Sequence, residues 1–227
     1  MRIAFISLLL AVLCTRALAE DPKPECDAKP LASPRITVSG LTDKDDQEVT
    51  LKGPVLSADH REGAWVFTIS DGARGEVVIH LDLPQSVNLD FNFWPAVEID
   101  YRHPLGFEGR ATGLRISDAD GIVLLVDDGQ YGNALRAREL EPFAISQEDA
   151  GCRNRKNTPG DLNNFWLVVK AGDASGKLIQ GQTGDLTYKD RAYTVIAIQS
   201  TARVDNVTWT DAPYEYVAYA IVRQPKK

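Results

Sequence analysis

Residues 64–83 read AWVFTISDGARGEVVIHLDL, and this stretch decides the fold class. Apolar side chains alternate with polar ones on both sides of a glycine-bearing loop at residues 71–75. A period of two is typical of a strand with one buried face, and a short glycine-bearing loop between two such strands is typical of a β-hairpin. The stretch therefore predicts two antiparallel strands joined by a tight turn.

Strand signals recur along most of the remaining chain, as alternation or as short runs rich in apolar, β-branched and aromatic residues. They fall at residues 35–38, 49–52, 97–102, 114–116, 122–126, 165–169, 192–200 and 214–222. We predict an all-β fold, an antiparallel β-sandwich or open barrel of roughly ten to twelve strands, with at most one or two short helices. The candidate helices are residues 133–141 and 147–150, and two long polar stretches, residues 141–163 and 172–184, are predicted as loops.

The N-terminus has the pattern of a secretory signal. Arg2 precedes an almost wholly apolar run over residues 3–13, which is too short to span a bilayer, and Ala17 and Ala19 form a small-x-small cleavage site. We predict a signal peptide over residues 1–19, an extended proline-containing lead-in over residues 20–34, and one β-rich domain over residues 35–227. The mature protein is expected to be extracytoplasmic, either periplasmic or secreted.

The charge of the chain limits its partners. The formal net charge is −7, and 44% of the residues are hydrophobic. An acidic chain does not attract a phosphate backbone, so we expect no nucleic-acid partner, and we expect no membrane span in the mature chain.

Two cysteines remain after signal cleavage, Cys26 and Cys152. In an oxidising compartment an even number of cysteines indicates a disulfide framework, and here one intramolecular pairing is available. We predict a bond between them, which ties the lead-in to the polar stretch around Cys152.

Signatures of catalysis and of cofactors are weak. The chain has no nucleophile elbow, zinc-protease motif or phosphate-binding glycine loop, so we expect a non-catalytic protein without a cofactor.

Carboxylates cluster at residues 118–120, at residues 127–128, and in one loop with Asp43, Asp45 and Asp46. Oxygen-rich loops suit calcium, and this last loop is the best candidate, although it lacks the full calcium-loop pattern.

The most suggestive functional feature is aromatic. Phe91, Asn92, Phe93 and Trp94 place rings beside an amide, and Asp90 precedes them. Rings can stack on sugar faces while amides and carboxylates bond hydroxyl groups, so the segment is a candidate carbohydrate-binding platform. The alternative is a core-facing strand with Trp94 as a lid, because aromatic side chains are mostly buried.

Three functions follow from these features. The first is an exported binding or interaction protein of the cell envelope, with a carbohydrate or an envelope protein as its partner. The second is a polysaccharide-acting hydrolase that uses two carboxylates, such as Asp82 and Asp100, as acid and base. The third is a secreted structural or inhibitory protein that acts through the loop around Cys152.

Overall fold

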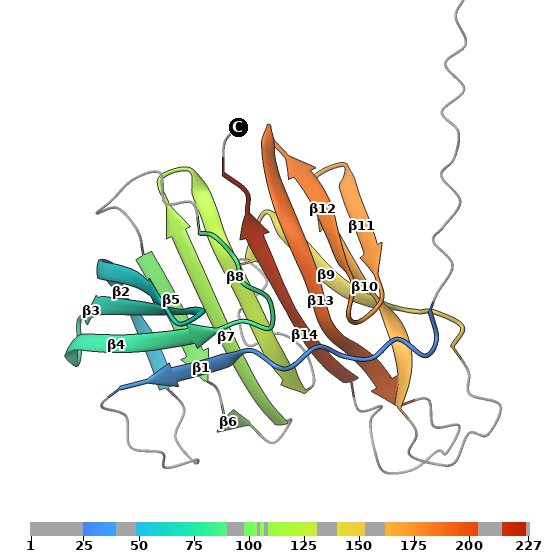
Figure 1. Ribbon diagram of the computed structural model, residues 1–227, viewed down its shortest axis with the longest axis horizontal. Helices are drawn as coiled ribbons and strands as arrows, with labels where there is room; N and C mark the ends of the chain where they lie inside the picture. Colours follow the sequence, from blue (N-terminus) through green and yellow to red (C-terminus); the bar gives the residue numbers. More distant parts are fainter. Residues whose placement is uncertain are drawn as a thin grey trace, which may run out of the picture.

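The computed structural model describes residues 25–39, 49–89, 98–103, 105–106, 109–130, 140–152, 162–203 and 215–225. Within these ranges the chain forms fourteen strands, all paired antiparallel, and one helical residue, Leu140 (Figure 1). The prediction of an all-β antiparallel sandwich is therefore confirmed.

Four strands form a front sheet in the order β1-β4-β3-β2. They are β1 (Arg35–Val38), β2 (Val49–Arg61), β3 (Ala64–Asp71) and β4 (Gly75–Asp82). The predicted hairpin is β3–β4, in which Asp71 lies opposite Gly75. The Asp71 Oδ1 atom accepts hydrogen bonds from the N–H groups of Ala73 and Arg74, at 3.1 and 2.9 Å, and these bonds fix the turn.

A larger central sheet runs in the order β2-β5-β7-β8-β14-β13, with β12 and the start of β10 both paired to the far edge of β13. Its further strands are β5 (Glu98–His103), β7 (Gly109–Asp118), β8 (Gly121–Gln130), β10 (Leu162–Ala171), β12 (Thr183–Tyr188), β13 (Arg191–Arg203) and β14 (Glu215–Arg223). A two-residue strand, β6 (Leu105–Gly106), pairs with the start of β7.

Two strands each pass from one sheet to another. Residues 49–54 of β2 pair with β5 in the central sheet, and residues 55–61 pair with β3 in the front sheet. The crossing requires Gly53, because a Cβ atom there would lie 1.9 Å from the backbone oxygen of Ser70. At the other end, residues 162–164 of β10 pair with β13, while residues 165–171 pair with β9 (Phe143–Asp149) in a back layer that also holds β11 (Ala174–Leu178).

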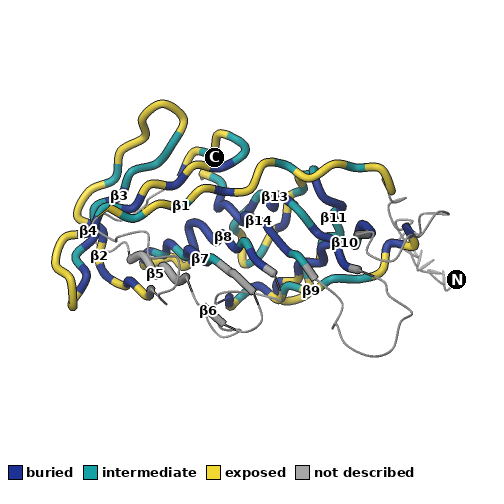
Figure 2. The backbone as a smooth tube through the Cα atoms, turned by 90° about the horizontal axis from the view of Figure 1, so that it is seen from below, coloured by how far each residue is buried: buried dark blue, intermediate teal, exposed yellow. Residues whose placement is uncertain are grey.

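The three layers enclose two cores on opposite faces of the central sheet (Figure 2). Alternate residues of β14 show the division: Ala218, Ala220 and Val222 belong to the core under the front sheet, whereas Val217, Tyr219 and Ile221 belong to the core under the back layer. Strand β13 divides in the same way, and β8 also contributes to both cores, although its neighbours Val123 and Leu124 both belong to the core under the front sheet. Burial on both faces is the reason that residues 122–126 are apolar without alternation.

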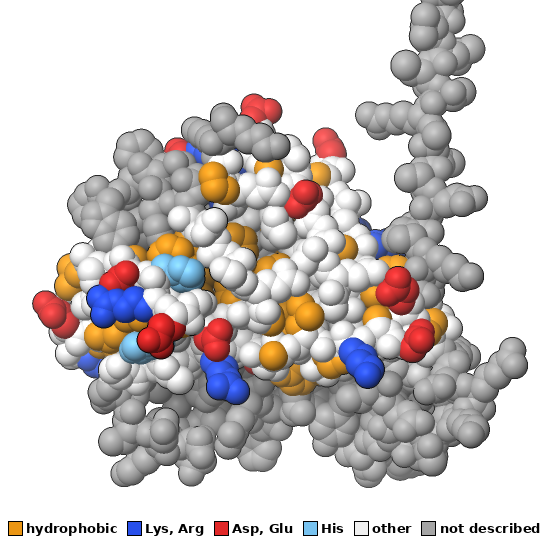
Figure 3. All heavy atoms as spheres, in the orientation of Figure 1, with side chains coloured by type: hydrophobic (Ala, Val, Ile, Leu, Met, Phe, Trp, Pro, Cys, Tyr) orange, Lys and Arg blue, Asp and Glu red, His pale blue; other side chains and the backbone are white. Residues whose placement is uncertain are grey.

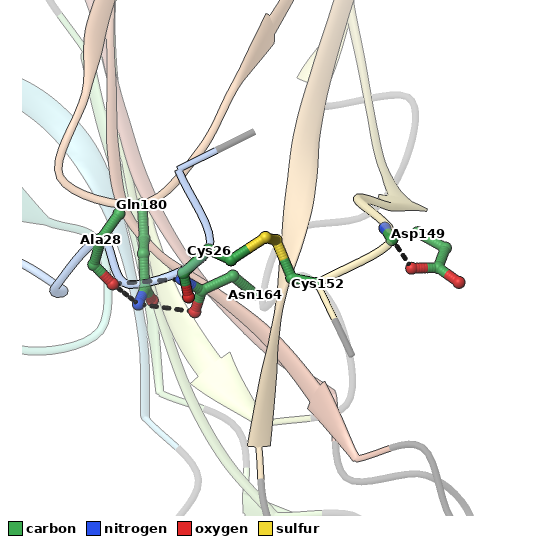
Figure 4. Close-up of a disulfide and its surroundings, with 7 residues drawn as sticks. Cys26, Ala28, Asp149, Cys152, Asn164 and Gln180 are labelled. Atoms are coloured by element: carbon green, nitrogen blue, oxygen red, sulfur yellow. Dashed lines mark hydrogen bonds between the residues drawn. A yellow bond between two sulfur atoms is a disulfide. The ribbon is translucent and has the colours of Figure 1, made fainter. Parts of the chain in front are cut away.

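The predicted disulfide is present. Cys26 and Cys152 are bonded, with their Cα atoms 5.0 Å apart and a separation of 126 positions in sequence. Two buried amides hold the same segment: Asn164 donates to the Cys26 and Ala28 carbonyls, both at 3.1 Å, and Gln180 donates to the Ala28 carbonyl at 2.7 Å (Figure 4). Further along, the Leu31 N–H bonds to the Ile198 carbonyl of β13 at 3.0 Å, so the lead-in is joined to the central sheet before it enters β1.

Two predicted loops contain strands. The polar stretch at residues 141–163 includes β9, and its residues 147–149, predicted as a helical turn, are the end of that strand. The stretch at residues 172–184 includes β11 and the start of β12. Most of the other candidate helix, predicted over residues 133–141, lies outside the described residues, which resume at Leu140.

Candidate functional site

An open groove of about 680 Å³ lies where two hairpins of the central sheet end side by side. Strands β7 and β8 form one hairpin, strands β12 and β13 form the other, and residues 141–142 before β9 line the groove as well. Its polar lining comprises Arg115, Ser117, Asp120, Glu141, Lys189 and Arg191, and its aromatic lining comprises Tyr188 and Tyr193. The volume of this groove lies within the range of ligand pockets, about 300–1,000 Å³.

Strand β7 supplies one side of the groove through its alternation. Leu114 and Ile116 point into the core under the front sheet, and both are fully buried. Arg115 and Ser117 therefore point to the opposite face, where the core under the back layer includes residues of β8, β13 and β14. The half-buried side chains of Arg115 and Ser117 are therefore the polar groups that β7 contributes to the groove.

The β12–β13 hairpin supplies the other side through a two-residue turn. Lys189 and Asp190 have φ angles of +46° and +60°, a left-handed conformation that non-glycine residues rarely adopt. Each such residue costs about 1–2 kcal/mol, somewhat less for Asp. The turn places Tyr188 and Lys189 on the groove, with the Lys189 Nζ atom 5.2 Å from the centre of the Tyr188 ring.

A buried ion pair lies below the groove. The Arg223 guanidinium donates to both carboxylate oxygens of Asp118, with Nη1–Oδ1 at 2.8 Å and Nη2–Oδ2 at 2.5 Å, and both side chains are fully buried. At the rim, Arg191 donates to Asp120 in a second ion pair. The backbone N–H of Asp120 bonds to Asp118 Oδ1 at 2.9 Å, which ties the two pairs together. The carboxylates at residues 118–120 thus hold arginines in place.

The cations affect a tyrosine in the floor of the groove. Tyr193 is buried and packs edge-on against Phe143, with ring centres 5.0 Å apart and an interplanar angle of 83°. Burial raises the pKa of Tyr193, while the positive charges of Arg223 and Arg191 oppose that rise. The floor of the groove therefore lies in the field of these two guanidinium groups.

The carboxylates at residues 127–128 have tyrosine neighbours. Asp127 is almost fully buried, opposite Tyr219, and burial and this carboxylate together hold the pKa of Tyr219 well above its usual value. Asp128 accepts a hydrogen bond from the Tyr216 hydroxyl. Burial, and then that bond, raise the pKa of Tyr216 to about 12. Both carboxylates interact within the protein rather than facing an open loop.

The aromatic segment and the acidic loop that the sequence singled out are not among the described residues. Phe91, Asn92, Phe93 and Trp94 lie outside the described residues, as do Asp43, Asp45 and Asp46. A second cavity of about 250 Å³ is lined by residues 85–88 together with residues of β13 and β14, just before the aromatic segment in sequence. Leu89, the last described residue before that segment, is buried in the core under the front sheet.

The carboxylates predicted for a hydrolase lie on different sheets. Asp82 is exposed on β4 in the front sheet, and Asp100 belongs to β5 in the central sheet, with β3 and β2 between those strands in the order. Over the front sheet, acidic, basic and histidine side chains are interspersed (Figure 3). Within the described part of the chain, no group of three or more His, Cys, Asp or Glu residues could hold a metal ion.

The groove itself was not predicted from the sequence. Its cations stand singly at positions 115, 189 and 191, without a motif that links them. The one local signal is the pair Lys189–Asp190, which occupies a tight turn without glycine.

Comparison of the chain with family models, curated proteins and solved structures found no match. In the described ranges, none of the helical structure has the length and apolar character that a membrane crossing needs.

Proposed function

We propose that the protein is an exported binding protein of the cell envelope that holds a saccharide in the groove between the β7–β8 and β12–β13 hairpins. The observation that carries the proposal is the groove itself, about 680 Å³ in volume, part of whose polar lining (Arg115, Ser117 and Arg191) lies on strands of a doubly buried sheet. Side chains on such strands are held in place before a ligand arrives, which lowers the entropic cost of binding.

Export has two independent supports. Residues 1–19 have the charge, length and cleavage site of a signal peptide. The Cys26–Cys152 disulfide belongs to an oxidising, extracytoplasmic environment. The mature chain is proposed to begin at Glu20, and intact-mass measurement of the exported protein tests that start.

A saccharide fits the mixture of groups at the groove. Tyr188 and Pro142 are half-buried and offer apolar surface to a sugar ring, while Ser117 and Glu141 can bond hydroxyl groups. The aromatic segment with Trp94 remains a proposed second contact, near the smaller cavity at residues 85–88. For this contact, Trp94→Ala is expected to weaken polysaccharide retention while the melting temperature stays nearly unchanged.

Affinity gel electrophoresis tests the groove. The mature protein is run through gels that contain dextran, xylan, a mixed-linkage glucan, alginate or polygalacturonate, and retardation by at least one of them is expected. Ser117→Trp, which fills the groove, should abolish that retardation, whereas a tryptophan at the exposed residue Thr37 of β1 should not. Retardation by none of the five polymers, or equal retardation of the Ser117→Trp variant, would overturn the proposal.

A further inference from the structure

The smaller cavity, of about 250 Å³, lies on the face of the central sheet that is turned towards the front sheet. Residues 85–88, which follow β4, form one wall, and residues of β13 and β14 form the other. Alternation along β13 separates this cavity from the groove, because Tyr193 lines the groove and the next residue, Thr194, lines the cavity. The two spaces therefore lie on opposite faces of the same strand.

The wall formed by residues 85–88 is held at both ends and in the middle. Leu83 and Leu89, which flank it, are buried in the core under the front sheet. The Trp65 indole N–H donates to the Val87 carbonyl at 3.1 Å. The side chains of this wall are thus presented from a fixed backbone, which lowers the entropic cost of binding a ligand.

The polar groups of the cavity are amides and hydroxyls. Within the described residues, the side chains of Gln85 and Asn88 form no hydrogen bond, so both amides can donate to a ligand and accept from it. The Gln224 side-chain nitrogen donates to Thr194 and to Asp185, both at 2.9 Å, and the Thr194 hydroxyl donates to Asp185 at 3.1 Å. These bonds hold the opposite wall in place.

The cavity presents no unpaired charge. Arg223 is the one ionisable residue of its described lining, and this side chain is fully buried and paired with Asp118. The floor is aliphatic, because Ile196 and Val222 belong to the core under the front sheet. An ionised ligand would lose hydration here without gaining a counter-charge, so the lining favours a neutral ligand with a small apolar group.

The volume limits the ligand to one small unit, because it is below the range of about 300–1,000 Å³ that drug-sized ligands occupy. Ser86 and Asn88 are exposed, so the cavity opens to solvent and the unit can be the end of a longer chain. An acetamido group combines an N–H donor, a carbonyl acceptor and a methyl group. Free amide side chains beside an aliphatic floor complement all three.

We propose that this cavity is a second binding site and that it takes a neutral acetamido sugar unit. The acetamido group bonds the amides of Gln85 and Asn88, and its methyl group contacts Ile196 and Val222. The choice of a saccharide rests on the proposed function, whereas the preference for an acetamido unit comes from the lining of the cavity.

Titration calorimetry tests the inference on the mature, disulfide-bonded protein with Ser117→Trp as background, so that the groove is filled. The probes are tetra-N-acetylchitotetraose and cellotetraose, which share one linkage and differ in an acetamido group against a hydroxyl on each ring. The acetylated tetramer is expected to bind at least tenfold more tightly, because it adds a buried methyl group and paired amide groups. Its affinity should stay constant as sodium chloride is raised from 50 to 500 mM, since no charge is involved.

Substitutions in the cavity locate the binding. Ser86→Trp should abolish it, and Gln85→Ala and Asn88→Ala should each weaken it by about threefold to tenfold. These two amides make no hydrogen bond within the described residues, so the melting temperature should not change in either alanine variant. Thr37→Trp, at an exposed residue of β1, is the matched control for the tryptophan and should leave the affinity unchanged.

The outcomes separate this inference from the proposed function. Cellotetraose binding as tight as that of the acetylated tetramer would overturn the acetamido preference. Binding that is unaffected by all three cavity substitutions would overturn the assignment to this cavity. Failure of the acetylated tetramer to bind would overturn the inference as a whole, whereas the proposed function is decided separately by polymer retardation of the protein with its groove intact.

Discussion

Replacing Arg223 by methionine should destabilise the protein more than any other single charge removal near the groove. The guanidinium makes two bonds to Asp118, and both side chains are fully buried. Removing the guanidinium takes this counter-charge away from a buried carboxylate, and breaking a buried ion pair typically costs about 3–5 kcal/mol. For a domain of this size that loss corresponds to a fall of about 6–20 °C in melting temperature.

The pH dependence of the Arg223→Met variant identifies the cause. Without the arginine, burial disfavours the charged form of Asp118, so the pKa of this carboxyl should rise above its unfolded value. In that situation the folded state binds more protons than the unfolded state, and the free energy of unfolding increases as the pH falls through the raised pKa. The destabilisation should therefore shrink between pH 8 and pH 5.

Urea unfolding monitored by circular dichroism measures the effect, with Asp118→Asn and the double variant completing a cycle. Asparagine keeps an acceptor for the Asp120 N–H and removes the buried charge, so the double variant should be more stable than Arg223→Met alone. A loss below about 1 kcal/mol, or additive single effects, would refute the claim that the pair acts as a unit.

Three further outcomes are expected. The double variant Cys26→Ser with Cys152→Ser should lose about 3–4 kcal/mol in urea unfolding, because the bond closes 126 residues of chain between two ordered segments; an unchanged midpoint would contradict this. Burial raises the pKa of Asp71, but hydrogen bonds from three backbone N–H groups together lower it by more than burial raises it, so the pKa lies below 3.8. The charged Asp71 carboxylate contributes fully to the free energy of unfolding above its unfolded pKa, and this contribution is lost as the pH falls through the folded pKa. Asp71→Asn should therefore make the free energy of unfolding less dependent on pH below about pH 4. Asp190→Gly should raise the melting temperature by about 1–2 °C by relieving the left-handed turn, and a lower melting temperature would mean that Asp190 has a stabilising contact that offsets the strain.

The sequence predicts the structure correctly where a single local pattern, such as alternation or a continuous apolar run, extends over a whole segment. The β3–β4 hairpin follows from alternation and a glycine-bearing turn. Strand β8 follows from an apolar run that only burial on both faces explains. The cysteine pairing follows from elimination, since the mature chain has two cysteines.

The back layer could not be predicted because its strands mix polar residues into buried rows. In β9, Phe143 and Ile145 point into the core, but the next residue on that face is Gln147. The Gln147 side-chain nitrogen donates to the Ser200 hydroxyl at 2.8 Å, a partner from a strand 53 residues away. A polar residue on the buried face interrupts the alternation of apolar and polar residues that identifies a strand, so the sequence of this segment indicates a loop.

The charged residues near the groove could not be predicted for the same reason: they are buried polar residues whose partners are distant in sequence. Arg223 ends the apolar run of β14, a position where a sequence pattern indicates a solvent-exposed strand end, yet its side chain is fully buried. Its partner, Asp118, belongs to a turn whose Asp and Gly residues are common hairpin chemistry. The two charges meet only after β7, β8 and β14 are aligned, and they then fix the floor from which Arg191 and Tyr193 face the groove. The positions of these charges are therefore a product of strand order, and the binding proposed for the groove would depend on the same ion pair that stabilises the end of the sheet.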